Sequence, residues 1–243
     1  MNHLRPIEHT AYTGSSVRSD AVAEAQKEFV TKVFGWMTAA LVVTGVVARG
    51  VFTSAALQQF VFGTPFVFFG LIIAELGLVI YLSAAIHRMS AATATWTFLA
   101  YSALNGLTLS VIFMAFTSES LASTFIITAA MFGAMAAWGY FTKKDLTGLG
   151  SLAFMGLVGI LIATLVNLFL RSEGIYWIVS YVGVLIFTGL TAYDTQKIKE
   201  MAVMGGSEDT ESYQKVAVLG ALTLYLDFIN LFIMMLRTMG RRR

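Results

Sequence analysis

Residues 224–232, Leu-Tyr-Leu-Asp-Phe-Ile-Asn-Leu-Phe, place an acid at the centre of an apolar run that reaches from about Val216 to Leu236. A run of roughly 20 apolar residues is long enough to cross a bilayer. An ionisable residue at that depth costs at least about 2.5–3.5 kcal/mol and usually marks an ion or proton path. At about 100° per residue, one stripe of this helix collects the following residues: Gly220, Thr223, Asp227, Asn230, Met234 and Arg237. A helix with one polar stripe and apolar remaining faces suits the middle of a bundle, so we expect this helix to be its hub.

The composition indicates a membrane protein with several spans. Of the 243 residues, 57% are hydrophobic, against about 45–50% in ordinary soluble domains. Only 12% are charged, where about 25% is usual, and the mean hydropathy is +0.75. With no cysteine in the chain, disulfides, thiol catalysis and zinc–thiolate sites are excluded. A net charge of +2 without a long basic block does not suggest nucleic-acid binding, and we expect no removable signal peptide.

The chain divides into a tail, a membrane domain and a short basic end. Residues 1–30 are polar, and we interpret them as a mobile cytoplasmic tail with a short amphipathic lead-in helix, capped at Asp20. Seven apolar segments follow, over residues 33–52, 65–86, 93–116, 121–141, 146–170, 175–193 and 216–236. Short links leave no room for a soluble domain. The predicted fold is therefore all-α, a seven-helix transmembrane domain over residues 31–238 with a basic tail at 239–243.

The distribution of lysine and arginine favours a cytoplasmic N-terminus. In that orientation ten basic residues lie on the inner side: Arg5, Arg18, Lys27, Lys32, Arg88, Lys143, Lys144, Lys197, Lys199 and Lys215. Six lie on the outer side: Arg49, Arg171, Arg237, Arg241, Arg242 and Arg243. The three terminal arginines oppose this orientation, and six spans with a re-entrant final segment would bring them back inside.

Two acids in neighbouring spans have no obvious cation at their depth. Asp194 ends the sixth predicted span on the inner side, and Asp227 lies midway along the seventh. If they meet, like charges at close range favour sharing a proton, and the pair titrates as one unit. The protonated pair would hold two helices together, and the deprotonated pair would offer oxygens to a hard cation such as calcium. The alternative is that Asp194 is solvated at a helix end and that Asp227 is satisfied by Asn230 or a neighbouring hydroxyl.

Two further charged residues are predicted to lie at similar depths in the membrane, near its outer face. Glu75 lies ten residues into the second span, and Arg237 closes the seventh about 15 Å beyond Asp227. We expect them to form an outer ion pair, acting either as a structural lock between helices or as an outer gate. Asn105 and Asn167 are candidates to line the same interior as Asn230 and Thr223, although polar contact between helices is their simpler role.

Enzymatic motifs are absent from the sequence. There is no Gly-x-Ser-x-Gly, His-Glu-x-x-His, Walker loop or EF-hand spacing, so we expect neither enzymatic activity nor a cofactor. Tyr193-Asp194 followed by an acid on the next span matches half of the intramembrane aspartyl protease motif. Such proteases carry Gly-x-Gly before the second acid, and the two glycines are replaced here by Leu224 and Leu226.

The hub stretch 224–232 with Arg237, the Tyr193-Asp194 pair, Glu75 and the run Lys143-Lys144-Asp145-Leu146 together resemble a bacterial member of the Bax inhibitor-1 family, over roughly residues 25–238. The resemblance implies a seven-helix bundle in the bacterial inner membrane, with the last helix central and the other six wrapped around it. It implies a pH-sensitive calcium leak with a di-aspartyl sensor at Asp194 and Asp227. The same two carboxylates would bind the calcium ion. It places a latch arginine at Arg88, beside His87, and an outer ion pair at Glu75 and Arg237. A second function is open on the same resemblance: a regulator that binds other membrane proteins and modulates cell death or membrane quality control.

Overall fold

The computed structural model describes residues 9–204 and 210–243, with side chains described from residue 20 onward except for 203–209. The chain forms helices joined by short links in this order: α1 (His9–Thr53), α2 (Ala55–Phe62), α3 (Pro65–Ala85), the 3₁₀ turn η1 (Ile86–Arg88), α4 (Ala91–Ala115), α5 (Ser118–Phe141), α6 (Thr147–Leu170), α7 (Glu173–Met204) and α8 (Thr210–Met239). Seven of them are long and apolar enough to cross a membrane: α1 and α3 to α8. The predicted all-α fold with seven spans is confirmed.

Local sequence signals start several of these helices. The side-chain oxygens of Ser90 and Thr117 accept hydrogen bonds from backbone N–H groups three residues on, which caps α4 and α5. Pro65 occupies the first turn of α3, as predicted, where its missing N–H leaves no bond unmade. Ser54 caps α2 in the same way, but this short helix between the first two spans was not predicted.

The helix boundaries differ from the sequence prediction at two places. The predicted cap Asp20 lies inside α1, because the helix runs without a break from His9 into the first span. Asp194 does not end the sixth span either, since α7 continues for ten more residues to Met204. No glycine or proline interrupts the segment after Asp194 before Gly205, so nothing there stops the helix. Residues 1–8 of the predicted mobile tail and the link 205–209 lie outside the described residues.

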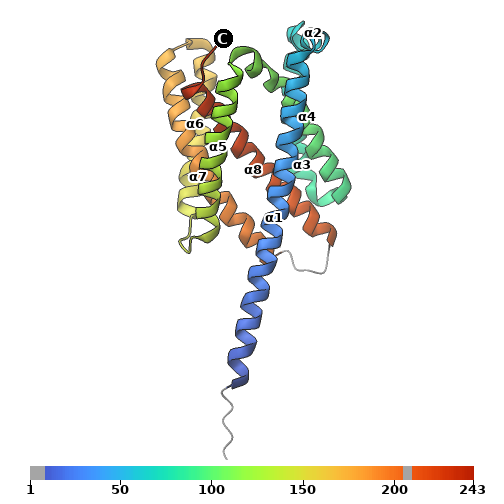
Figure 1. Cartoon of the computed structure of the whole chain (residues 1–243), viewed down its shortest axis with the longest axis vertical. Coiled ribbons are helices and arrows are strands. Elements are labelled where there is room, and N and C mark those ends of the chain that lie inside the picture. Colours follow the sequence, from blue (N-terminus) through green and yellow to red (C-terminus); the bar gives the residue numbers. More distant parts are fainter. Residues whose placement is uncertain (1–8, 205–209) are drawn as a thin grey trace, which may run out of the picture.

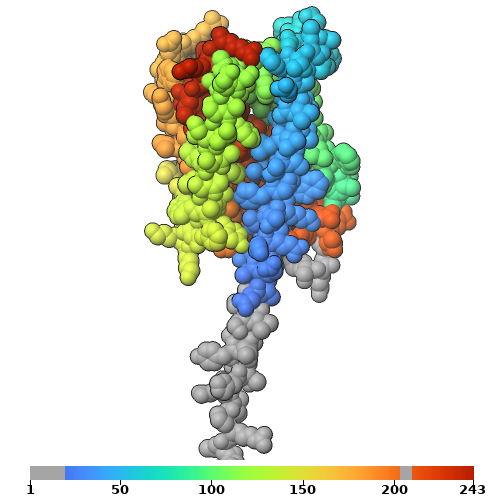
Figure 2. Space-filling view, in the orientation of Figure 1, coloured from blue at the N-terminus to red at the C-terminus, as the bar shows by residue number. Residues whose placement is uncertain are grey.

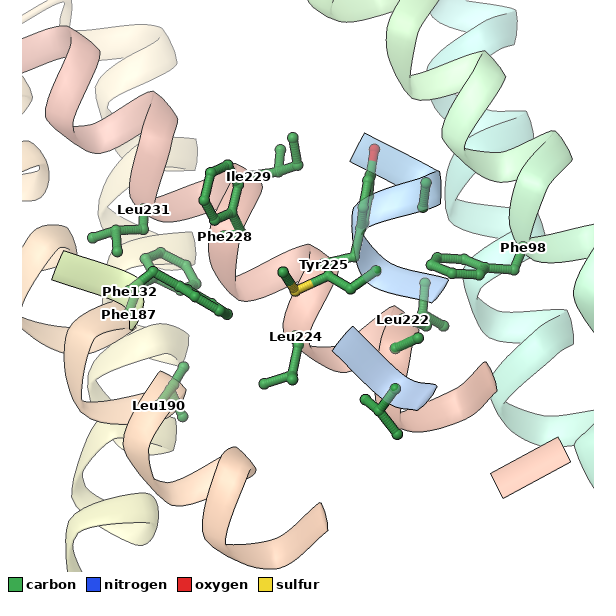
Figure 3. Packing of buried hydrophobic residues seen from close by; sticks show 14 of the residues in the cluster. Phe98, Phe132, Phe187, Leu190, Leu222, Leu224, Tyr225, Phe228, Ile229 and Leu231 are labelled. Carbon is green, nitrogen blue, oxygen red and sulfur yellow. The ribbon is translucent and has the colours of Figure 1, made fainter. Parts of the chain in front are cut away.

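Helix α8 is the most buried of the spans. Two-thirds of its apolar window is buried (67%), against 6% in α3 and 11% in α6. It packs against α1, α4, α5 and α7, and Figure 1 shows it crossing obliquely behind α1 and α5. Figure 3 shows Leu222, Leu224, Tyr225 and Phe228 of α8 among buried rings from its neighbours, including Phe98. The apolar faces of α8 thus supply much of the core.

The chain ends at the opposite end of the bundle from the start of α1 (Figure 1). The terminal residues are paired with the α4–α5 link through backbone hydrogen bonds: Thr117 N–H donates to Arg241 O at 3.1 Å, and Arg243 N–H donates to Ala115 O at 3.0 Å. Because α8 is one continuous 30-residue helix, the alternative of a re-entrant final segment does not occur. Which end faces the cytoplasm stays a prediction from the basic residues.

One glycine allows α5 to touch the backbone of α7. A Cβ atom at Gly139 would collide with the backbone carbonyl of Ala192, two residues before Asp194. Backbone, unlike a long side chain, cannot move aside locally, so this contact fixes the separation of the two helices.

We therefore expect Gly139→Ala to destabilise the fold by about 1–3 kcal/mol, the usual range for overpacking. Gly133→Ala, on the same helix, is the matched control, since a Cβ atom there meets no atom within 4 Å. Thermal unfolding of the purified protein in detergent measures both. A midpoint for Gly139→Ala as high as that of Gly133→Ala would contradict the close approach.

Candidate functional site

The carboxyl groups of Asp194 on α7 and Asp227 on α8 lie in direct contact, within reach of a hydrogen bond between the two side chains. Asp227 is only 5% exposed. Its Oδ2 atom is buried and has no hydrogen-bond partner. A hydrogen bond between two carboxyl groups requires that one of them holds a proton, since ionised carboxylates only accept. The structure thus brings together the two acids that the sequence singled out.

A cavity of about 510 Å³ opens beside the two acids, between α6, α7 and α8. Its walls are formed by Gly150, Ser151, Phe154, Leu157, Phe187, Leu190, Tyr193, Asp194, Lys197, Thr223, Leu226, Asp227 and Asn230. The ionisable members of this lining are the two acids, Tyr193 and Lys197. Thr223 and Asn230 therefore line the same space as the acids, as predicted from their stripe on the last helix.

Lys197 is the cation in the lining of this cavity, and the sequence prediction did not assign it to the site. It follows Asp194 by three residues on α7 and interacts with it electrostatically. Its ammonium group lies 5.9 Å from the ring centroid of Tyr193. The i, i+3 spacing was the available signal, because it places two side chains on one helix face. That signal depends on α7 continuing past Tyr193.

The predicted latch at Arg88 is not formed. Arg88 ends the turn η1 and its side chain is exposed. Among the residues whose side chains are described, Glu24 and Lys27 form the one salt bridge, so Arg88 pairs with neither aspartate. Arg88 does lie at the end of the second span, as the prediction required, but on a different side of the bundle from the aspartates. The turn η1 packs on α3 and α8, and no residue of it lines the cavity.

The α5–α6 link holds the segment of α7 around Asp194. Gln196 bridges this link twice: its Oε1 accepts from Leu146 N–H at 2.9 Å, and its Nε2 donates to Lys144 O at 2.8 Å. In the same link, hydrogen bonds from the side chain and then the backbone N–H of Thr147 lower the pKa of the Asp145 carboxyl. The ring of Tyr193 packs closely on the backbone of Gly150, the fourth residue of α6. A Cβ atom at Gly150 would lie only about 2.6 Å from atoms of this ring.

The predicted ion pair between Glu75 and Arg237 is wrong for the described structure. The Oε1 of Glu75 accepts from the Thr108 hydroxyl at 2.7 Å, and its Oε2 accepts from Asn105 Nδ2 at 3.2 Å. The guanidinium of Arg237 lies instead over the ring of Tyr176, 5.5 Å from its centroid. Both groups were assigned to similar depths, but Glu75 faces α4 and Arg237 faces α7.

Asn105 belongs to a second buried polar system, on the opposite side of α8 from the aspartates. The hydroxyl of Tyr225 donates to Asn105 Oδ1 at 3.0 Å and shares a 2.7 Å hydrogen bond with the Thr44 hydroxyl. Glu75, Asn105, Tyr225 and Thr44 thereby connect α3, α4, α8 and α1. Asn105 consequently does not line the cavity of the acids.

Asn167 does not line that cavity either. Its Oδ1 accepts from the backbone N–H of Ser172 at 2.8 Å, which closes the turn between α6 and α7. Arg171 in this turn adopts a left-handed conformation with φ of 50°. The side chain of Asn167 therefore supports the end of α6, and it lines a hollow that Arg237 and Arg242 also line.

These features define a polytopic α-helical membrane protein with a cavity between three of its spans and a pair of carboxyl groups in the cavity wall. No group of three or more potential metal ligands (His, Cys, Asp or Glu) occurs among the described residues. The chain belongs to the Bax inhibitor-1 family, since residues 26–243 match the family described as "Inhibitor of apoptosis-promoting Bax1".

Relatives occur in distant bacteria. The chain is 51% identical over 229 residues to "Inner membrane protein YbhL" of Escherichia coli strain K12, which covers 93% of this chain and 98% of that protein. It is 46% identical over 218 residues to an uncharacterized protein of Borreliella burgdorferi, covering 90% and 94% of the two chains. A protein of Rickettsia prowazekii is 39% identical over 239 residues, with 98% and 99% covered. Membership of the family therefore extends over the whole membrane domain.

We expect Tyr225→Phe to lower the stability by about 0.6–1.7 kcal/mol, from the average to the maximum found for hydrogen bonds between membrane helices. The change leaves Asn105 Oδ1 without its donor while the ring keeps its contacts with Phe98 and Tyr101. Thermal unfolding in detergent measures the effect. Tyr181→Phe, at an exposed ring 58% accessible, is the control and should leave the midpoint unchanged. Equal midpoints for the two variants would show that the network does not stabilise the fold.

Proposed function

We propose that this Bax inhibitor-1 family protein is a pH-sensitive calcium leak of the bacterial inner membrane, gated by the proton shared between Asp194 and Asp227. The observation that carries the proposal is the buried contact of these two carboxyl groups at the wall of a cavity. Calcium is the transported ion here, not a resident cofactor.

The unpartnered oxygen of Asp227 supports a site that exchanges a proton for a cation. A buried oxygen without a donor is costly, and either a proton or a metal ion would satisfy it. With the proton present, the pair carries at most one negative charge and ties α7 to α8. Without it, two like charges in contact repel each other and attract a divalent cation.

Apart from the ammonium group of Lys197, the polar groups of the cavity include oxygens of the kind that calcium prefers. Calcium binds oxygen ligands from carboxylates, amide carbonyls and waters. Asn230 uses its Nδ2 to donate to Leu226 O, which leaves its Oδ1 available to the cavity. The hydroxyl of Thr223 also lines the space, so two carboxylates and two neutral oxygens are available. A set this small would bind the ion weakly, which suits passage better than storage.

We expect calcium flux into proteoliposomes to fall on acidification, by no more than about tenfold per pH unit if one proton controls the gate. Asp194→Asn and Asp227→Asn should each abolish this pH dependence, because an amide cannot exchange the proton. Flux is measured with a calcium-sensitive dye inside the vesicles over a series of external pH values.

Asp145→Asn is the matched control, since Asp145 is an exposed acid on the link next to α7 and asparagine keeps its acceptor oxygen. It should behave as the wild type. The site assignment would be refuted by a pH profile that both Asp194→Asn and Asp227→Asn leave unchanged. The leak itself would be refuted by wild-type flux equal to that of empty vesicles.

A further inference from the structure

A long apolar groove runs between α1 and α5 on the face shown in Figure 2. It consists of two adjoining hollows of about 470 and 410 Å³, which share wall residues from both helices and from α8. The shared residues are Leu41, Gly45, Phe125 and Phe228. The two hollows are therefore one continuous feature, distinct from the cavity of the aspartates.

The groove is open because small residues line it and α8 lies at its base. A Cβ atom at Gly45 or Gly133 would meet no atom within 4 Å, so the wall is unfilled at both positions. The ring of Phe228 packs against Phe125 and Phe132 of α5, with centroids 5.4 Å apart in each pair. The base of the groove is thus aromatic and apolar.

The groove lies within membrane-spanning segments, so the bilayer covers it. Its walls offer few hydrogen-bonding groups, which suits a hydrocarbon chain and excludes a polar ligand. From Arg49 to Thr38, both of which line it, the distance along α1 is about 17 Å at 1.5 Å per residue. One leaflet of a hydrocarbon core of about 30 Å has nearly that depth.

Two arginines that lack a carboxylate partner among the described side chains lie at one end of the groove. Arg49 and Phe52 line this end, and the guanidinium of Arg243 lies 4.9 Å from the ring centroid of Phe52. Neither arginine has a carboxylate within 4.0 Å among the side chains that the structure describes, where Glu24–Lys27 is the one salt bridge. Guanidinium groups bind phosphate oxygens in a bidentate manner.

We propose that this groove is a binding site for an anionic phospholipid of the leaflet at the Arg49 end. The acyl chain lies along Gly45 and Leu41 against Phe228, and the phosphate meets Arg49 and Arg243. The site does not depend on ion transport by the protein. It places a lipid in contact with the residue that follows Asp227 on α8.

The test is native mass spectrometry of the full-length protein, released from detergent after incubation with equal amounts of phosphatidylglycerol and phosphatidylcholine that carry identical acyl chains. Attraction between one arginine and an anionic headgroup corresponds to retention of about five times more phosphatidylglycerol than phosphatidylcholine. Arg49→Gln should bring the retained amounts of the two lipids close to parity. Arg171→Gln, with the same change in net charge at the α6–α7 turn, should keep the wild-type preference.

Filling the groove tests the acyl-chain part of the site. Gly45→Leu should reduce retention of both lipids at least about fivefold, whereas Gly35→Leu, at an open position of α1 outside the groove, should not. Ala129→Leu fills the groove from α5 and should act like Gly45→Leu, with its exposed neighbour Ala130→Leu as the control. The second pair of variants decides the question if Gly45→Leu does not fold.

Three results would overturn the proposal. One is equal retention of phosphatidylglycerol and phosphatidylcholine by the wild type. Another is retention by the groove-filling variants as high as that of their controls. The third is a lipid-free dimer as the main species, dispersed by Gly45→Leu and Ala129→Leu, because a second copy of the chain would then occupy the groove.

Discussion

A carboxyl group in the middle of a membrane-spanning helix must be satisfied from inside the protein, and this requirement organises the bundle. Asp227 on α8 is met by Asp194 on α7, so these two helices must lie close together at this depth. The closeness depends in turn on Gly139, which brings α5 onto the backbone of α7, and on Gln196, which ties α7 to the α5–α6 link. Without these contacts, Asp227 would face hydrocarbon without a partner at a cost of several kcal/mol.

Different sides of helix α8 contact different helices, through polar groups on two sides and an aromatic ring on a third. Tyr225 and Asp227 are two residues apart and point about 200° apart around the axis. Tyr225 faces the hydroxyl and amide groups of α1 and α4, and Asp227 faces α7. Phe228, about 100° further on, packs its ring on α5. Three nearby positions of one helix therefore contact four different helices, which explains why the stretch 224–232 is so distinctive in the sequence.

The sequence predicted depth along the helices well and direction around them poorly. Hydropathy located all seven spans, and the stripe on the last helix correctly grouped Thr223, Asp227 and Asn230 around one cavity. Glu75 and Arg237 were matched by depth alone, but they face α4 and α7 and never meet.

The limits of hydropathy also explain why Arg88, and not Lys197, was predicted to be the cation of the site. Arg88 was chosen because it ends a span, whereas Lys197 occupies the position beside Asp194 because α7 continues past the apolar segment. Hydropathy ends a span where polarity begins, although a helix continues until a residue breaks it.

If the two carboxylates repel each other when the proton leaves, the structure indicates which side of the cavity can yield. Helix α8 is held on four neighbours, through the Tyr225 network, and by the pairing of residues 241 and 243 with the α4–α5 link. Helix α6 packs mainly against α7 and is otherwise exposed. A displacement of α6 would therefore break fewer buried contacts than a displacement of α7 or α8, and it would widen the cavity that α6 shares with Asp194 and Asp227. Two firmly held helices with one yielding outer helix form the arrangement that a gate controlled by one proton would require, since a proton supplies only a few kcal/mol.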